Sequence, residues 1–160
     1  MTIALKVEVP FACFRQSRAR EYIRTYPVPP PSTVYGMLLS LVGEVDRYRH
    51  CGVEIAIALL SQPELSAVLR TLHRVKTLPR EDKQNQRPDY QEILSNIELM
   101  VWVRQGVEET VPCLRDRVFA AILRPHEIDR FGSLCLGESR DLVDAVSIVS
   151  EGEIEPPLQW

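Results

Sequence analysis

Hydrophobic periodicity predicts a mixed α+β domain in which strands and helices alternate along the chain. Apolar residues recur at every second position over residues 3–9, which is typical of a strand with one buried face. They recur at helical spacing over residues 34–42, and a β-branched apolar run follows at residues 53–60. The predicted order is strand, helix, strand, insertion, strand, helix, strand. This is the β-α-β-β-α-β pattern of ferredoxin-like folds, with both helices on one side of an antiparallel sheet.

Each element of the first half has its own local signal. The first strand is expected to bury Ile3, Leu5, Val7 and Val9. The first helix is expected to begin after Ser32, whose hydroxyl is a common N-cap, and to end at Gly43. Its buried face comprises Val34, Met37, Leu38, Leu41 and Val42. Residues 53–60 (VEIAIALL) predict a second, more buried strand.

The second half repeats this organisation. Residues 97–104 (IELMVWVR) predict a third strand. Pro112 suits the first turn of a second helix, which Pro125 ends. The apolar face of this helix comprises Leu114, Val118, Ala121 and Ile122. Residues 133–136 and 143–149 are short strand candidates separated by Gly137.

Composition indicates a single globular domain over residues 1–160. The chain is 45% hydrophobic and 26% charged, and it contains no apolar run of the ~18 residues that span a bilayer. Lys6 and Glu8 interrupt the N-terminal segment, which therefore does not resemble a signal peptide. We expect a cytoplasmic protein without a membrane partner.

The cysteines favour buried reduced thiols over a metal site. Cys13, Cys51, Cys113 and Cys135 occur singly, without C-x-x-C spacing, and the three histidines are far apart. We therefore expect no metal and no cofactor.

Residues 14–36 combine cations, aromatic rings and a proline-stiffened turn. The candidate phosphate ligands are Arg15, Arg18, Arg20 and Arg24, and the candidate stacking rings are Tyr22 and Tyr26. Four prolines between residues 27 and 31 hold the backbone extended, and the amides after Ser32 offer another phosphate site. This combination suits single-stranded nucleic acid, although a solvated charged loop explains the same residues equally well.

A polar insertion at about residues 61–96 separates the second and third predicted strands. We interpret it as a basic projection, part of it mobile, whose candidate RNA ligands, should it bind RNA, are Arg70, His73, Arg74, Lys76 and Arg80. A flexible solvated loop is the alternative. The net charge of −3 hides an asymmetry, because residues 1–90 carry +4 and residues 91–160 carry −7. A basic face for nucleic acid is therefore compatible with an acidic total.

Three motifs in this order and spacing resemble the Cas five family of type I CRISPR effector complexes. The first strand ends in an aromatic and an arginine, at Phe14 and Arg15. Residues 26–36 (YPVPPPSTVYG) resemble the proline-rich turn that leads into a Ser/Thr-capped helix, and residues 136–139 (LGES) resemble a late Leu-Gly-x-Ser turn. Glu138 departs from the family pattern, because that position is often basic in relatives.

The resemblance implies an RRM-type (RAMP) palm with a thumb inserted between strands two and three, which is where the basic insertion lies. It implies a non-catalytic subunit that caps the 5′ handle of the guide RNA (crRNA). The implied partners are the large subunit and the first backbone subunit, with target DNA reached through the assembled complex.

Two other functions explain the same residues. Some relatives cut precursor RNA, and metal-free cleavage here would need Tyr22, His73 and Lys76 to meet around a 2′-hydroxyl. His50 and His126 lie in other predicted elements. A ferredoxin-like domain can also act as a protein-interaction module that does not bind RNA.

Overall fold

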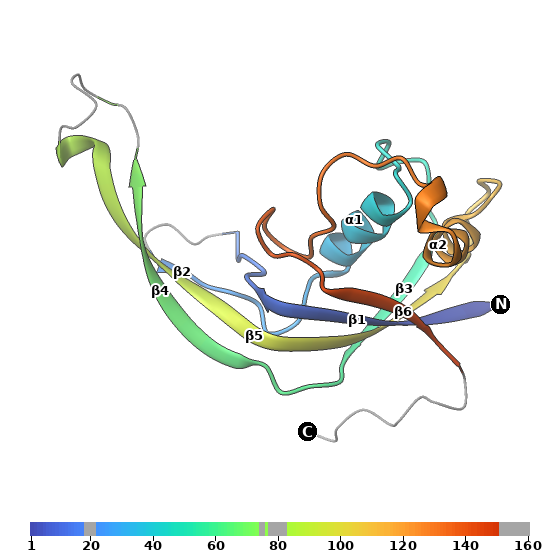
Figure 1. Cartoon of the computed structure of the whole chain (residues 1–160), viewed down its shortest axis with the longest axis horizontal. Coiled ribbons are helices and arrows are strands. Elements are labelled where there is room, and N and C mark those ends of the chain that lie inside the picture. The colour runs from blue at the N-terminus through green and yellow to red at the C-terminus, as the bar shows by residue number, and fades with distance from the viewer. Residues whose placement is uncertain (18–21, 74–75, 77–82, 151–160) are drawn as a thin grey trace.

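The computed structural model describes residues 1–17, 22–73, 76 and 83–150. These residues form one six-stranded sheet and two α-helices, which confirms the predicted α+β class (Figure 1). The central strand is β5, Gln86–Arg104, whose 19 residues pair with four other strands. Along β5 the molecule divides into two parts, which we call the body and the hairpin.

The body is a four-stranded sheet covered on one face by both helices. Its strand order is β3 (Glu54–Leu59), residues 97–104 of β5, β1 (Thr2–Ala12) and β6 (Ala145–Val149), with antiparallel neighbours. Helices α1 (Pro31–Leu41) and α2 (Leu114–Leu123) lie on the same side of this sheet (Figure 1). The core between them contains Leu5, Val7, Val9, Val34, Leu38, Leu99, Val101, Leu114 and Val118. The predicted strand over residues 3–9 and both helices are therefore confirmed.

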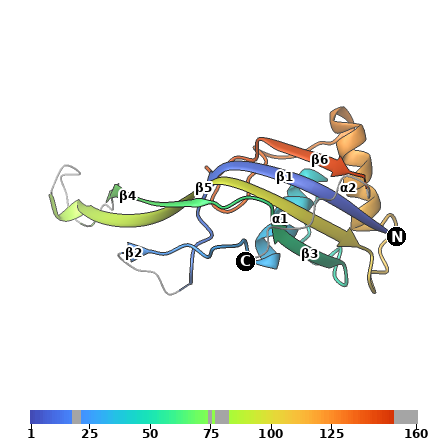
Figure 2. The ribbon, with the colours of Figure 1, turned by 90° about the horizontal axis from the view of Figure 1, so that it is seen from below.

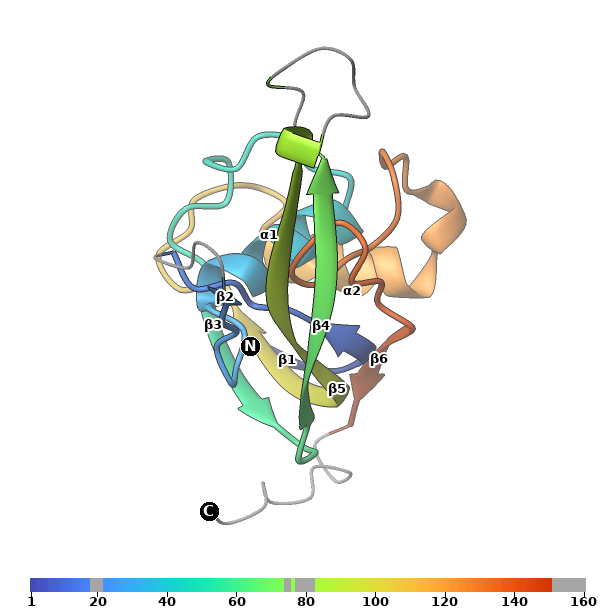
Figure 3. The same cartoon turned by 90° about the vertical axis from the view of Figure 1, so that its left-hand side faces the viewer.

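The hairpin extends the sheet beyond the body (Figure 2). Strand β4 (Glu64–His73) pairs antiparallel with residues 86–95 of β5, from Glu64 opposite Ser95 to His73 opposite Gln86. The short β2 (Tyr22–Ile23) runs parallel to β5 on its other edge, and a 3₁₀ turn over Lys83–Asn85 begins the return strand. Figure 3 views the molecule with this hairpin in front. The projection inferred from the sequence is an ordered β-hairpin over its described residues rather than a loop.

The N-cap prediction at Ser32 is wrong. Helix α1 begins one residue earlier, at Pro31, with Pro30 as its N-cap. The Pro30 carbonyl accepts hydrogen bonds from the Thr33 and Val34 amides. Proline at the first helical position has a suitable φ and lacks an amide that would need a partner, so the Ser32 hydroxyl is not required as a cap.

Two strand predictions also need correction. Strand β3 is partly exposed rather than fully buried, because it pairs with β5 on one side and is an edge strand. Residues 133–136 form no strand, because they make a single bridge between Cys135 and Leu142. Strand β6 occupies the later part of the last predicted segment, at Ala145–Val149.

The four cysteines are free, but they are not all buried. Cys13 and Cys113 are buried, Cys135 is half-buried and Cys51 is exposed. No group of three His, Cys, Asp or Glu side chains able to hold a metal occurs within the described ranges. Within the same ranges, no helix is both long enough and apolar enough to cross a membrane.

Candidate nucleic-acid interface

The fold brings the arginine–tyrosine segment against the base of the hairpin. Tyr22 and Ile23 in β2 pair with Tyr90 and Gln91 in β5, although the residues of each pair are 68 positions apart in the sequence. The rings of Tyr22 and Tyr90 stack, with centroids 6.2 Å apart and an interplanar angle of 25°. Their exposed fractions are 46% and 51%, so both rings are accessible to a partner. Two rings at this spacing provide a surface onto which an unpaired base can stack.

Leucines from β4 continue this exposed surface. Leu69 lies directly opposite Tyr90, and Leu65 lies four positions earlier on the same face of β4. Leu65 and Leu69 are each about 60% exposed. We call Tyr22, Leu65, Leu69 and Tyr90 the apolar face of the hairpin. Exposed apolar side chains gathered on one face of a sheet are typical of a binding site.

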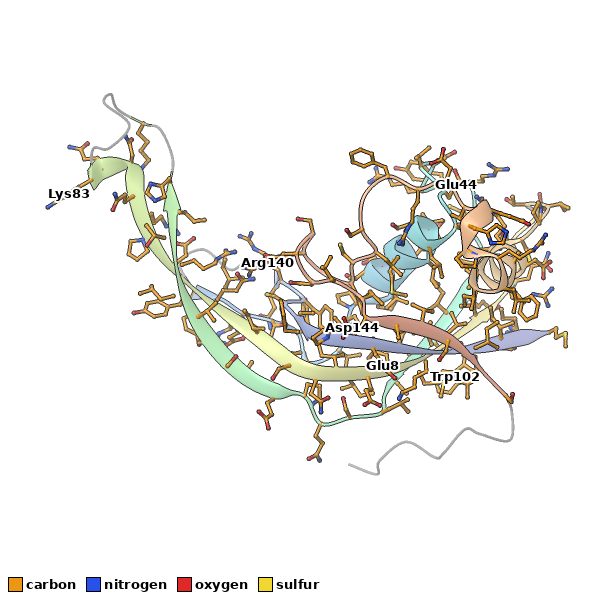
Figure 4. The ribbon with its side chains drawn as sticks, viewed as in Figure 1. Glu8, Glu44, Lys83, Trp102, Arg140 and Asp144 are labelled. Atoms are coloured by element: carbon orange, nitrogen blue, oxygen red, sulfur yellow. The ribbon has the colours of Figure 1, made fainter. Side chains whose placement is uncertain are left out.

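The opposite face of the hairpin packs against the turn over residues 136–141. Gln91 is fully buried, and its side-chain oxygen accepts a hydrogen bond from the Arg140 guanidinium. On β4, Arg70 Nη1 lies 3.7 Å from Glu138 Oε2. Figure 4 shows Arg140 where the hairpin leaves the body, on the side of the sheet that carries the helices. These contacts join the hairpin to the body.

The 136–141 turn is itself held to the end of β1. Asp141 Oδ2 accepts hydrogen bonds from the amides of Cys13 (2.9 Å) and Glu138 (2.8 Å). Gly137 has φ 118°, and a Cβ there would lie 2.6 Å from Asp141 Oδ2. Glycine is therefore required for this turn. Burial raises the pKa of the Asp141 carboxyl and that of the Cys13 thiol.

A small ladder fixes the backbone on either side of residues 18–21. The Tyr26 amide donates to the Phe14 carbonyl (2.8 Å), and the Gln16 amide donates to the Arg24 carbonyl (2.9 Å). Arg15 pairs with Thr25, whose amide donates to Glu92 Oε2 on β5 (2.9 Å). Arg15 and Arg24 are exposed and lie beside the hairpin base. Two cations are therefore placed near the stacked tyrosines.

The remaining predicted site residues have different positions. Tyr26 is 41% exposed, and it lines an open apolar groove of about 500 Å³ with residues 28–31, Ile55 and Ile57. Ser32 is exposed at the start of α1. His73 and Lys76 are exposed at the far end of the hairpin, where the Lys76 amide donates to Asn85 Oδ1 (2.7 Å). Arg18, Arg20, Arg74 and Arg80 lie outside the described residues.

The described residues do not assemble the ribonuclease site considered from the sequence. Tyr22 is level with Tyr90, and His73 is level with Gln86. Four residues of extended strand separate these levels, a distance of about 13 Å. His50 is fully buried in the body, where its ring contacts Glu108 and Arg117. His50 therefore has a structural role that ties the 44–51 loop to the start of α2, where the Leu114 amide donates to Glu108.

Sequence reasoning does not single out Tyr90 or Arg140, and it favours a solvated polar role for Gln91, which the structure buries. Tyr90 and Gln91 lie within a polar stretch, and Arg140 lies in a turn with two acidic neighbours nearby. Their importance follows from the register of β4, β2 and β5, which brings together residues distant in sequence. The pairing of Tyr90 with Leu69 is itself favourable, because an aromatic ring opposite a leucine stabilises a strand pair. This preference is the signal that favours a strand at Tyr90.

Comparisons with known proteins agree with this architecture. A sequence profile of the family described as CRISPR-associated protein (Cas_Cas5) matches residues 2–145. The CRISPR-associated protein Cas5 of Myxococcus xanthus (strain DK1622) is 42% identical over 158 residues, which cover 97% of this chain and 73% of that protein. The chain belongs to the Cas5 family. The resemblance to the Cas five family inferred from the three motifs is thereby confirmed.

Two solved structures show the same fold at low sequence identity. One, titled CRISPR RNA-guided surveillance complex, matches with a TM-score of 0.67 at 16% identity, over 90% of this chain and 60% of that chain. The other, titled Crystal structure of Cas protein, matches with a TM-score of 0.56 at 18% identity, over 99% of this chain and 67% of that chain. This Cas5 chain thus spans less than two thirds of the length of the first of these structures. Both likenesses concern the fold alone.

Proposed function

We propose that this Cas5 chain is a non-catalytic subunit of a CRISPR surveillance complex that binds and caps the 5′ handle of the guide RNA. Family membership supports the assignment to CRISPR machinery. The observation that carries RNA binding is the stacked Tyr22–Tyr90 pair beside Arg15 and Arg24. Aromatic rings next to cations suit splayed bases and their phosphates.

We further interpret the body as a ferredoxin-like palm and the hairpin as the thumb. The β3-β5-β1-β6 order, with both helices on one face, matches the arrangement expected for a palm. The hairpin lies between the second and third strands of that palm in sequence, as the thumb of the family does. The exposed leucines of the hairpin, Leu65 and Leu69, are a candidate contact for the first backbone subunit, and the large subunit would contact the palm.

Binding of labelled repeat-derived RNA to the purified chain, measured against a scrambled RNA over a salt series, tests this proposal. Handle-preferring binding with intact RNA on a denaturing gel is expected. Shortened RNA without added metal would indicate a ribonuclease. Equal and feeble binding to both RNAs would contradict handle recognition and favour a protein-interaction module.

Substitutions at the stacked tyrosines sharpen the test. Loss of one base stack costs about 1–3 kcal/mol, so we expect Tyr90→Ala to weaken binding by about fivefold or more. Tyr90→Phe keeps the ring and is the matched control. Binding by Tyr90→Ala as tight as that by Tyr90→Phe would exclude the ring pair as the base-stacking surface.

The arginine segment is tested through the dependence of affinity on salt. The triple variant Arg15→Ala, Arg18→Ala, Arg20→Ala should bind RNA more weakly and show a shallower salt slope, by about 0.7 for each lost phosphate contact. Arg124→Ala is a suitable control, because Arg124 is exposed beyond α2 and pairs with Glu127. An unchanged slope in the triple variant would contradict a phosphate role for this segment.

A further inference from the structure

Glu138 lies between two arginines that come from distant parts of the chain. Its Oε2 atom is 3.2 Å from Arg140 Nε and 3.7 Å from Arg70 Nη1. Arg70 belongs to β4 of the hairpin, whereas Arg140 belongs to the turn that packs on the body. The side chains of Arg70, Glu138 and Arg140 are 24%, 26% and 41% exposed, so solvent reaches all three. One carboxylate oxygen thus lies against two guanidinium groups at an accessible junction, and a second carboxylate oxygen, Asp141 Oδ1, is 3.9 Å from Arg140 Nε.

The two arginines are positioned by contacts that do not involve the Glu138 carboxylate. Arg140 donates to the buried Gln91 side chain, and the backbone of Arg70 is fixed by the pairing of β4 with β5, opposite Asp89. The backbone of Glu138 is held by its amide bond to Asp141 and by the conformation of Gly137. The backbone of Arg70 and the guanidinium of Arg140 are therefore held by contacts that do not need the Glu138 carboxylate.

Within the part of the chain that the structure describes, one donor of the two arginines has no hydrogen-bond partner while Glu138 lies between them. The Arg70 Nε atom is buried and has no hydrogen-bond partner among the described residues. A phosphate group offers more acceptor oxygens than the single carboxylate oxygen that Arg70 faces here, and the planar guanidinium fork matches phosphate well. The junction therefore suits a phosphate better than it suits the carboxylate that occupies it.

We propose that Arg70 and Arg140 form a phosphate site, which Glu138 fills in the unbound chain and a phosphodiester of bound RNA takes over. This inference rests on the proposed RNA-binding function and adds an exchange to it. A carboxylate and a phosphodiester compete for the same guanidinium donors, and their like charges repel each other. Glu138 thereby acts as a competitor of RNA, in a turn where the family motif often has a basic residue.

Glu138→Gln tests the exchange, because it removes the negative charge and keeps the shape. We expect Glu138→Gln to bind handle RNA about two- to fivefold more tightly than the unmodified chain, the range that a partly exposed ion pair supports. Glu127→Gln is the matched control, because it changes the net charge equally at an exposed pair with Arg124. Equal or weaker binding by Glu138→Gln, or equal tightening in both variants, would overturn the exchange.

A double-mutant cycle tests whether Glu138 competes with RNA at Arg140. Arg140→Ala should weaken RNA binding more in the Glu138→Gln background than in the unmodified chain, because the released arginine is then fully available to the phosphate. Equal losses in the two backgrounds would show that Glu138 does not compete at Arg140.

A second measurement does not depend on RNA. Inorganic phosphate should raise the thermal midpoint of Glu138→Gln more than that of Glu127→Gln, since a ligand stabilises the state that binds it. An equal response would overturn the phosphate site. A positive phosphate response without RNA binding by any variant would instead contradict the proposed function and leave the phosphate site supported.

Discussion

The two halves of β5 share one extended backbone but have opposite surroundings. Residues 97–104 run between β1 and β3 under two helices, and there Ile97, Leu99, Val101 and Val103 are at most 1% exposed. Residues 86–95 run between β4 and β2, where Leu69 and Tyr90 remain more than half exposed. The body is therefore stabilised by burial. The hairpin is held by cross-strand pairs and by its contacts with the 136–141 turn.

This difference separates stability from binding within one strand. Asn96 marks the boundary, because it adopts a left-handed φ of 58° between the two halves. Asparagine tolerates this conformation better than most residues. Substitutions in the body should change the free energy of unfolding, whereas substitutions on the apolar face of the hairpin should change partner binding.

The largest effect on stability is expected in the body half of β5. Leu99 is fully buried among the helices and β1. Leu99→Ala removes that packing and leaves a cavity, which should lower the free energy of unfolding by about 2–5 kcal/mol. Urea unfolding monitored by circular dichroism measures the change. A loss below 1 kcal/mol would show that the body core repacks around this site.

The next largest effect on stability is expected at Gly137, in the 136–141 turn that joins the hairpin to the body. Gly137→Ala places a Cβ against Asp141 Oδ2 and keeps a strained φ, which should cost about 1–3 kcal/mol. Gly132→Ala is the control, because Gly132 also has a positive φ (77°) but a Cβ there would meet no atom within 4 Å. Equal losses in the two variants would show that left-handed strain, rather than the contact with Asp141, decides the cost.

A pH-dependent effect is expected at Glu44 in the body. The Arg117 guanidinium and the Asp46 amide lower the pKa of Glu44 from 4.5 to about 2. A carboxyl whose pKa is lowered by folding stabilises the protein above its unfolded pKa, and this contribution is lost as the pH falls from 4.5 towards 2. The free energies of unfolding of Glu44→Gln and of the unmodified chain should therefore differ at pH 7 and converge near pH 2.

Glu54→Gln is the control for that experiment, because Glu54 pairs with Arg104 at an exposed position. We expect its difference from the unmodified chain to be smaller at pH 7, since exposed ion pairs contribute little. A Glu44→Gln difference that stays constant with pH would contradict the assignment of the ion pair with Arg117.

The smallest effect on stability is expected on the hairpin. Leu69 is 60% exposed, so Leu69→Ala should change the free energy of unfolding by less than about 0.5 kcal/mol. The same urea experiment used for Leu99→Ala measures it. A loss comparable to that of Leu99→Ala would erase the distinction between the two halves.

The elements of the body could be predicted from the sequence because their two faces have different surroundings. Burial on one side produces the period-2 pattern of residues 3–9 and the helical spacing at Val34, Met37 and Leu38. The strand at residues 97–104 was also found, although its extension back to Gln86 was not. Polar side chains dominate that earlier part, so it lacks an apolar period.

The hairpin and the stacked tyrosines could not be derived in the same way. In β4, Leu65 and Leu69 lie on one face while Val68 and Leu72 lie on the other, so apolar residues do not mark one side. The Tyr22–Tyr90 contact depends on strand register between distant segments. A fixed turn such as 136–141 likewise depends on a buried carboxylate, Asp141, whose partners at Cys13 and Glu138 cannot be inferred from local sequence.

The length of β5 also constrains the order in which the chain can fold. Its pairing with β4 joins residues as close in sequence as His73 and Gln86, whereas its pairing with β1 joins Thr2 to Arg104. Short-range pairing closes smaller loops and is faster, so the hairpin should form before the body sheet. The partners of β1 in the described sheet are β5 and β6, so during synthesis β1 has no strand to pair with until β5 has been made. Strand β6 is synthesised last and completes the sheet. A hairpin that forms early would thus present β5 as the strand with which β1 and β3 pair when the body forms.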